Sequence, residues 1–478
     1  MSTVWIIQAT DFLAAFLFIY GLKRMSSPVT ARSGVRVAGY GMLLAMLAGF
    51  LYVFGLSPDA APHLTVNLSL TVAALIIGIG WAWRGGKRVA LTDMPQMVAL
   101  YNGMGGGAAG AIAAVELLGG KADSATHLAV TLVGAVIGSV SFSGSLVAWA
   151  KLDGRVNKPW RVRGQHLYNA AVLLITLALG VAVAVGVAGV PTQALVAVFF
   201  GVALIYGVMA TMPIGGADMP VVISLYNALT GLAVGLDGFV LQNPALMIAG
   251  MVVGSAGTLL TLLMARAMNR SVSNVLFSNF GDVNIEQQGE IAGAMKPVEA
   301  SDAAIAMRYA GKVIIVPGYG LAAAQAQQKL YEFVKALQAA GVEVKFAIHP
   351  VAGRMPGHMD VLLAEAGVPY DLIVELDEVN DEFASTDVAL VIGANDVVNP
   401  AARTDKSSPI YGMPILNVDY AHQVYVLKRG QGKGYAGVEN ALFYRDNCNM
   451  VYGDARETLV KMIQAVKDLG DDGSASAA

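Results

Sequence analysis

Nine apolar stretches in the first 270 residues constrain this chain most, because each is close to the length that spans a bilayer. A helix needs roughly 20 apolar residues to cross the hydrocarbon core. We predict spans at residues 4–22, 37–56, 64–83, 95–118, 128–149, 168–189, 193–213, 219–237 and 244–265. Glycine and polar residues interrupt the fourth and eighth, so these two are expected to be broken or tilted. Only 14% of the whole chain is charged, against about a quarter in soluble domains, which also favours a helical membrane bundle.

Basic residues in the connecting segments predict the orientation of this bundle. Taken alternately, the segments on one side carry Lys23, Arg24, Arg32, Arg36, Arg84, Lys87, Arg88, Lys151, Arg155, Lys158, Arg161, Arg163, Arg266 and Arg270. The segments on the other side carry only Lys121. The positive-inside rule places the basic side in the cytoplasm. An odd number of spans then puts the N-terminus outside and the C-terminal part in the cytoplasm.

Four polar residues inside or beside the spans are candidates for a function, because burial of such groups in lipid is costly. They are Asn102, Ser145, Asp218 and Asn227. Each could instead make an ordinary interhelical hydrogen bond, and Asp218 could cap the helix that begins near Pro220. Together they predict a polar path through the bundle. The glycine-rich segments 103–110 and 250–257 predict close packing of helices.

The chain changes character near residue 270. Residues 1–270 form the predicted transmembrane domain, residues 271–310 a polar linker, and residues 311–478 a doubly wound, Rossmann-like α/β domain. We expect a parallel sheet with strands at 312–317, 342–348, 387–392, 413–418 and 424–427. A helix from about 455 to 469 is expected to close the domain.

A dinucleotide fingerprint follows the first of these strands. Gly318, Gly320 and Ala323 stand between the strand and a helix that is expected to run to about residue 340. In this setting Gly318 permits a tight turn, Gly320 lets a pyrophosphate approach the backbone, and Ala323 allows close helix packing. The N-terminus of the following helix would then bind phosphate.

Two further features predict NADP(H) rather than NAD(H). No acidic residue follows Ile348 at the end of the second strand, where NAD-binding domains usually carry one. Lys428 and Arg429 follow a later strand and suit a 2′-phosphate, although a solvated cation pair is the alternative. The polar segment 393–400 follows another strand, at the edge where open α/β sheets bind ligands.

Composition excludes other classes of protein. Cys448 is the single cysteine, so the chain has no intrachain disulfide and no cysteine-based metal site, and a buried thiol is expected. A net charge of −3 with no dense basic tract gives no reason to expect a nucleic-acid partner.

Five strings resemble the β subunit of proton-translocating NAD(P) transhydrogenase: PGYGLAAAQAQ, HPVAGRMPGHMDVLLAEAGVPYD, IGANDVVNPAA, KRGQGKGYAGVEN and GGADMPVVISLYNA. The resemblance covers essentially the whole chain. It implies a bacterial inner-membrane enzyme that couples inward proton movement to hydride transfer from NADH to NADP+, giving NADPH. An α partner, of one chain or two, would supply the NAD(H)-binding domain and further membrane helices, in a dimer of αβ protomers.

The resemblance also implies the residues that line the nucleotide. Besides Gly318, Gly320 and Ala323, these are Tyr319, Val351, Ala352, Gly353, Arg354, Met355, Pro356, Gly393, Ala394, Asn395, Asp396, Val397, Lys428, Arg429, Gly430, Gln431, Gly432, Lys433, Gly434, Tyr435, Asp454 and Ala455. Members of the family bind NADP(H) in a reversed orientation, which would place the fingerprint glycines further from the pyrophosphate. No metal or flavin is expected, since hydride passes directly between two positioned nicotinamides.

In the membrane, the family's proton-linked positions correspond to Asn102, Ser145, Asp218 and Asn227. Several relatives have a histidine where this chain has Asn102, and asparagine does not titrate. His63, His127 and His166 fall in loops or at span ends. The titrating histidine is therefore expected on a helix of the partner.

Two rival functions remain at this stage. A nucleotide-regulated cation channel or transporter would need a selectivity filter, which Gly39-Tyr40-Gly41 suggests only superficially because no Thr-Val precedes it. A structural membrane anchor for a dehydrogenase would not need the polar residues inside the spans.

Overall fold

The computed structural model describes residues 2–54, 63–120, 124–156, 160, 162, 164–215, 218–269, 271–277, 293–353, 357–406, 408, 410–432, 434 and 436–475. The chain divides into two compact units, Met1–Thr261 and Leu262–Ala478.

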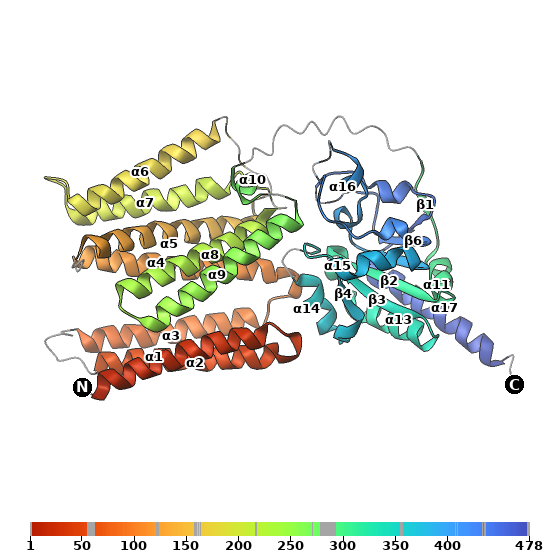
Figure 1. The fold of residues 1–478 in the computed structure, drawn as a ribbon, viewed down its shortest axis with the longest axis horizontal. Coiled ribbons are helices and arrows are strands. Elements are labelled where there is room, and N and C mark those ends of the chain that lie inside the picture. The colour runs from red at the N-terminus through yellow and green to blue at the C-terminus, as the bar shows by residue number, and fades with distance from the viewer. Residues whose placement is uncertain are drawn as a thin grey trace. The chain divides into compact units, whose positions relative to one another are not determined.

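Within the described residues, nine helices are long and apolar enough to cross a membrane, which confirms the predicted number. They are α1 Ser2–Met25, α2 Pro28–Phe54, α3 Leu64–Gly86, α4 Met94–Gly119, α5 Ala125–Leu152, α6 Gln165–Val185, α7 Thr192–Thr211, α8 Met219–Val240 and α9 Pro244–Ala267 (Figure 1). Helices α4 and α8 are continuous, so of the two alternatives for the fourth and eighth spans, broken or tilted, the break is not seen. The glycines that suggested a break pack against neighbouring helices instead.

Helices α4, α5 and α8 form the interior of the bundle. Helix α5 packs against α4, α7 and α8, and α4 also packs against α8 (Figure 1). In the most apolar 18-residue stretch of each helix, 56% of the residues of both α5 and α8 are buried inside the protein, whereas none of those of α3 is buried. The apolar side chains of α3 therefore face outward, as lipid or a partner helix requires.

Small residues set the close packing of α8 against α9, as the glycine-rich segment 250–257 predicted. A Cβ on Gly250 would lie 2.2 Å from the backbone nitrogen of Gly235, and one on Gly231 would lie 2.3 Å from that of Gly254. Helices α8 and α9 therefore touch backbone to backbone, which only glycine permits.

The C-terminal unit is a seven-stranded parallel sheet with the order β1-β7-β6-β5-β2-β3-β4. Its strands are β1 Lys296–Pro297, β2 Lys312–Pro317, β3 Glu343–Ile348, β4 Ile373–Glu375, β5 Val388–Ile392, β6 Gln423–Lys428 and β7 Cys448–Tyr452. Its helices are α10 Val272–Phe277, α11 Ala300–Arg308, α12 Tyr319–Ala323, α13 Gln327–Ala339, α14 His358–Glu365, α15 Leu376–Val379, α16 Ala401–Thr404 and α17 Ala455–Ala475.

The predicted Rossmann-like fold is confirmed, with three differences in detail. Residues 413–418 form no strand: the N–H of Leu416 donates to the carbonyl of Val397, outside the strands, and a short helical turn follows at Val418–Tyr420. The helix after the fingerprint is interrupted at residues 324–326, where Gln325 adopts a φ of +49°. Residues 296–308, expected in a linker that is helical in part, supply the edge strand β1 in addition to helix α11, which packs on α17.

The middle of the sheet is the core of this unit. Residues Ile314, Val316, Ala389 and Val391 of β2 and β5 are fully buried. Such continuous apolar runs are typical of parallel strands that are covered on both faces. Cys448 is buried in β7, as expected, and burial raises the pKa of its thiol to about 12.

The contact between α8 and α9 leads to a first prediction. Gly250→Ala should push the two helices apart and lower the free energy of unfolding by about 1–3 kcal/mol, because a Cβ has no room there. Gly78→Ala in α3 is the matched control, since nothing lies within 4 Å of a Cβ at that position. Thermal unfolding of both variants in detergent tests this, and an equal effect of the two substitutions would contradict the packing described.

Candidate functional site

The carboxyl edge of the sheet gathers most of the predicted nucleotide-binding residues that the structure describes. Strands β2 and β5 are neighbours, yet the chain leaves β2 toward β3 on one side and β5 toward β6 on the other. The strand order therefore reverses between β2 and β5, and open α/β sheets bind ligands at such a switch point. The segments after these two strands, Gly318–Gly320 and Gly393–Asn395, meet there.

The fingerprint glycines serve this meeting of two loops. The N–H of Gly320 donates to the carbonyl of Gly393 at 3.0 Å, and that of Gly318 donates to Ile392 at 2.8 Å. A Cβ on Gly320 would lie 2.6 Å from the Cα of Gly393, whose φ of +68° itself favours glycine. The close approach expected of a pyrophosphate at Gly320 is thus made by the neighbouring loop.

The helix that directly follows the fingerprint is shorter than expected. Helix α12 has only five residues, and the N–H of Leu321 already donates to Gly318 at 3.0 Å. Ala323 ends this short helix and precedes the interruption.

Backbone and amide hydrogen bonds tie the segment after β5 to residues 434–442. Asp396 Oδ2 accepts from the N–H of Ala436 at 2.8 Å, so Gly434 and Ala436 lie against this carboxylate. Asn440 is buried, and its Nδ2 donates to the carbonyl of Asn395 at 2.9 Å. Buried Asn399 donates in the same way to the carbonyl of Glu439 at 3.0 Å. Sequence reasoning singled out Asn395 and Asp396 but missed Asn399 and Asn440, which fix the two loops together.

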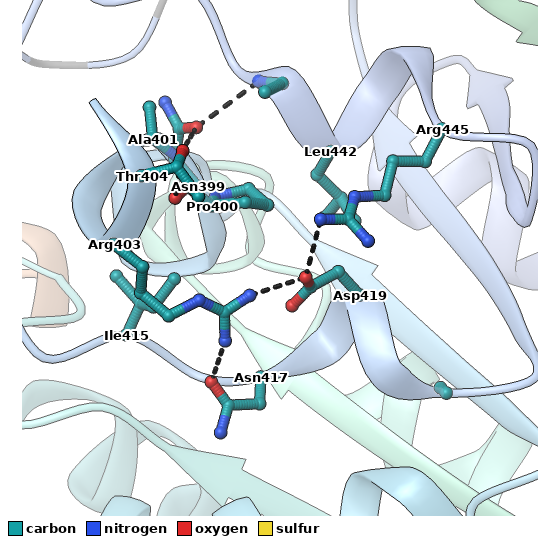
Figure 2. Close-up of polar contacts among 12 residues, drawn as sticks. Asn399, Pro400, Ala401, Arg403, Thr404, Ile415, Asn417, Asp419, Leu442 and Arg445 are labelled. Atoms are coloured by element: carbon teal, nitrogen blue, oxygen red, sulfur yellow. Dashed lines mark hydrogen bonds and ion pairs between the residues drawn. The ribbon is translucent and has the colours of Figure 1, made fainter.

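An ion-pair cluster around the buried carboxylate of Asp419 supports the loop after β5. Figure 2 shows Arg403 and Arg445 converging on Asp419, whose side chain is fully buried. Arg403 also donates to Asn417 and lies over the ring of Tyr420 at 4.7 Å. The cluster therefore anchors α16, which directly follows the Asp396–Asn399 segment. Nothing in the spacing of these residues along the chain pointed to this arrangement.

The two cations after β6 differ in their surroundings. Lys428 Nζ donates to the carbonyl of Gly432 and lies 4.8 Å from the centre of the Phe443 ring. Burial lowers the pKa of Lys428. Arg429 is exposed and makes no hydrogen bond or ion pair with any residue that the structure describes. Its guanidinium is therefore available to an anionic ligand.

Acidic residues gather at the opposite end of the carboxyl edge. Burial raises the pKa of Glu375 at the end of β4, and the carboxylates of Asp360, Glu378 and Asp377 raise it further. This end of the edge repels a phosphate, whereas the end at Lys428 and Arg429 attracts one. Glu343, at the far end of β3, pairs with Lys345 at 3.6 Å.

A buried histidine shapes the loop after β3. His349 Nε2 lies 2.7 Å from the carbonyl of Pro414, and its Nδ1 accepts from the N–H of Val351 at 3.2 Å. Both ring nitrogens are used in the neutral form. Burial lowers the pKa of His349 to about 4, although the bond to Pro414 raises it. Ala352 and Gly353 follow, and the φ of +100° at Gly353 favours glycine.

The remaining predicted nucleotide residues lie at the same edge or outside the description. Asp454 follows β7 and accepts from the N–H of Arg456 at 2.9 Å, so it caps α17 just before buried Ala455. The Tyr319 ring meets that of His358 edge-on at 6.4 Å between centres. The structure also describes Val397, Gly430, Gln431, Gly432 and Gly434 in the loops already named. Arg354, Met355, Pro356, Lys433 and Tyr435 lie outside the described residues.

In the membrane unit, two of the four predicted polar residues are in contact. Asn102 Nδ2 of α4 donates to Ser145 Oγ of α5 at 3.0 Å. One turn before Ser145 in α5, Ser141 forms a hydrogen bond with Thr230 of α8 and donates another to the carbonyl of Tyr226 at 3.0 Å. These groups form a polar seam between α4, α5 and α8. Sequence reasoning missed Ser141 and Thr230, whose hydroxyls look ordinary in an apolar helix.

The other two predicted residues lie elsewhere on α8. Asp218 is 1% exposed and precedes α8, but its side chain accepts no capping hydrogen bond from that helix. The capping role considered for Asp218 is therefore not seen. Asn227 is half-buried and makes no side-chain hydrogen bond within the described part of the chain.

Comparison with known proteins agrees with both units. The sequence matches the family described as NAD(P) transhydrogenase beta subunit over residues 7–465. Two sequences from Rhodospirillum rubrum named NAD(P) transhydrogenase subunit beta are each 44% identical over 471 residues, covering 96% of this chain and 98% of theirs.

The chain belongs to the NAD(P) transhydrogenase beta subunit family.

Membership makes the chain a subunit of an NAD(P) transhydrogenase that acts as part of a complex with an alpha partner. The channel interpretation finds no support. Gly39, Tyr40 and Gly41 are helical within α2, and a Cβ on Gly41 would lie 3.1 Å from the carbonyl of Ala14 in α1. Gly41 therefore packs α2 against α1.

The environment of His349 predicts how the subunit responds to acid. Because its pKa is depressed from 6.5 to about 4, the unfolded chain takes up a proton between these values that the folded chain does not. The contribution of His349 to the free energy of unfolding is fully present above pH 6.5 and decreases as the pH falls toward 4, by up to about 3 kcal/mol. Amide hydrogen exchange of residues 344–353 over this pH range measures it. His349→Gln, which removes the titrating ring, should flatten the dependence, whereas the exposed His422→Gln should not.

Proposed function

We propose that this subunit binds NADP(H) at the carboxyl edge of its sheet and couples proton movement through its membrane bundle to hydride transfer from NADH. The observation that carries the proposal is the polar seam of α4, α5 and α8 in a chain whose other unit is a dinucleotide-binding fold. A transhydrogenase needs no seam of hydrogen-bonding groups across lipid unless a proton or ion crosses there.

The choice of NADP(H) follows from the charges along the carboxyl edge. Arg429, beside Lys428, would bind the 2′-phosphate, since a guanidinium binds phosphate in two places at once. The acidic residues at the end of β4 disfavour a phosphate at that end of the carboxyl edge. The loops after β3, β5 and β6 would hold the rest of the nucleotide. When bound, NADP+ supplies the hydride-accepting nicotinamide ring.

The proton path would use the seam and the carboxylate beside it. Asn102 does not titrate, so its part is to orient Ser145 or water, and the hydroxyls of Ser141 and Thr230 can relay a proton between neighbours. Asp218, buried at the start of α8, would exchange the proton with water on its side. Asn227 would interact with water rather than with protein. The titrating histidine of several relatives would reside on a partner helix.

The basic connecting segments support an orientation with the N-terminus outside and the C-terminal unit in the cytoplasm of a bacterial inner membrane. Proton movement inward would then drive hydride from NADH to NADP+. The outward-facing apolar side chains of α3 suit contact with further helices of the α partner, in a dimer of αβ protomers.

Nucleotide preference tests the first half of the proposal. The purified subunit in detergent should bind NADPH far more tightly than NADH by calorimetry. Arg429→Ala should weaken NADPH binding by about 1.5–3 kcal/mol, the value of a charge-assisted hydrogen bond, and leave NADH binding unchanged. Lys467→Ala, on the exposed face of α17, is the control. Equal affinities of the unaltered subunit for the two nucleotides would refute the assignment.

The subunit alone should not catalyse transhydrogenation. Direct hydride transfer requires the two reacting carbons about 3–3.5 Å apart, and one nucleotide site cannot arrange this. The purified chain should therefore bind NADPH but leave an NAD analogue unreduced until the NAD(H)-binding partner is added. Turnover in a preparation that mass spectrometry shows to be free of the partner would disprove the two-subunit arrangement.

A further inference from the structure

A second buried carboxyl group stands near the end of α8 opposite to Asp218. Asp237 is 2% exposed, and its Oδ2 is buried with no hydrogen-bond partner among the described residues. Its Oδ1 lies against α5, 3.5 Å from the position that a Cβ of Gly134 would occupy. The nineteen residues from Asp218 to Asp237 correspond to about 28 Å of helix, nearly the thickness of the hydrocarbon core.

Structural roles do not account for Asp237. A buried carboxylate without a hydrogen bond destabilises a fold. Its place in the last turn of α8 adds to this cost, because the carbonyl end of a helix carries partial negative charge. The residue therefore neither caps the helix nor pairs with a cation of the described chain. Ionisable residues kept in a membrane span at such a cost usually serve transport.

A histidine shares the helix contact with this carboxyl group. His127 Nε2, in the first turn of α5, lies 2.9 Å from the carbonyl of Val240, one turn beyond Asp237. A carbonyl only accepts, so Nε2 carries the hydrogen. Nδ1 is then the basic nitrogen, and it is buried without a hydrogen-bond partner in the described chain. Glu116 of α4 is the other ionisable side chain described on the outer halves of the helices that pack with α8.

Helical spacing places these groups on the same face as the polar seam. His127, Thr131, Gly134, Ser141 and Ser145 follow one another at intervals of three, four or seven residues along α5, which keeps them on one side. Thr131 is 2% exposed and donates to the carbonyl of His127 at 2.9 Å. Asp237 lies two turns of α8 beyond Thr230, about 10 Å. The contact between α5 and α8 therefore joins the outer carboxyl group to the seam.

We propose that Asp237 carries protons in the outer half of this seam, with His127 as the group that delivers them. The carboxylate takes a proton from the outer side, through Nδ1 of His127 or water, and becomes a neutral acid. It then releases the same proton through water toward Thr230 and Ser141 and returns to the carboxylate. The two buried carboxyl groups thus stand at the two mouths of one path. This inference rests on the proposed proton coupling and orientation.

The complex with the α partner, reconstituted in lipid vesicles, provides the test. NADPH formation from NADH and NADP+ is measured with and without an imposed pH gradient. Single-turnover hydride transfer between nucleotides already bound is followed by stopped flow, because it needs no proton passage. Asp237→Asn should reduce the gradient-driven rate by at least about tenfold, while single-turnover transfer changes by less than about twofold. Asp237→Glu should keep the gradient response, and Glu116→Gln, a carboxyl control at similar depth, should behave as the unaltered complex.

The possible outcomes separate this inference from the proposed function. A normal gradient response in Asp237→Asn would overturn the role of Asp237, as would an equal loss of both rates, which indicates a structural role. Loss of the response in Asp237→Glu would also overturn it. If Asp237→Asn fails to assemble with the partner, Asp237→Ala replaces it, since alanine leaves no polar group buried at this position. An unaltered complex without any gradient response would instead refute the proposed proton coupling itself.

Discussion

A polar group inside a bilayer has no bulk water to bind, and this constraint explains how the membrane unit is built. Hydroxyl and amide side chains meet along one contact between α4, α5 and α8, where Asn102 bonds Ser145 and Ser141 bonds Thr230. Glycine allows those helices to approach closely enough for these short side chains to reach one another. Close packing and the polar seam are therefore one feature, and enlarging a glycine should disturb both.

In the C-terminal unit, a few side chains hold the loops of the carboxyl edge in place. Parallel strands bring segments from β2, β3, β5, β6 and β7 to one edge, and buried groups then hold those segments in place. The fingerprint glycines join the loops after β2 and β5, Asn399 and Asn440 join the loop after β5 to residues 439–440, and Asp419 pairs with Arg403 of α16 and with Arg445. Arg429 has no hydrogen bond or ion pair with a described residue and is exposed, so it can bind a ligand.

The sequence predicts the periodic features of this protein well and the long-range contacts poorly. Nine spans follow from apolar length, and the parallel sheet follows from alternating strand and helix patterns. Residues 413–418 look like a strand because Ile415 and Leu416 are apolar, but these side chains fill the core from an extended loop. Asn399, Asn440 and Ser141 could not be singled out, since each matters only through a partner at least 40 residues away. Lys428 and Arg429 were found because charge at a strand end has local meaning.

Asp237 can be recognised as unusual only in the folded structure. Along the sequence it closes an apolar span and reads as an interfacial residue that water solvates. In the fold, packing against Gly134 removes that water, and no described donor replaces it. A carboxyl group at this position is useful only if it exchanges its proton, because a permanently charged one destabilises α8 and a permanently neutral one could be asparagine. The hydride chemistry needs no ionisable side chain, so the ionisable groups of the bundle are left to serve the proton.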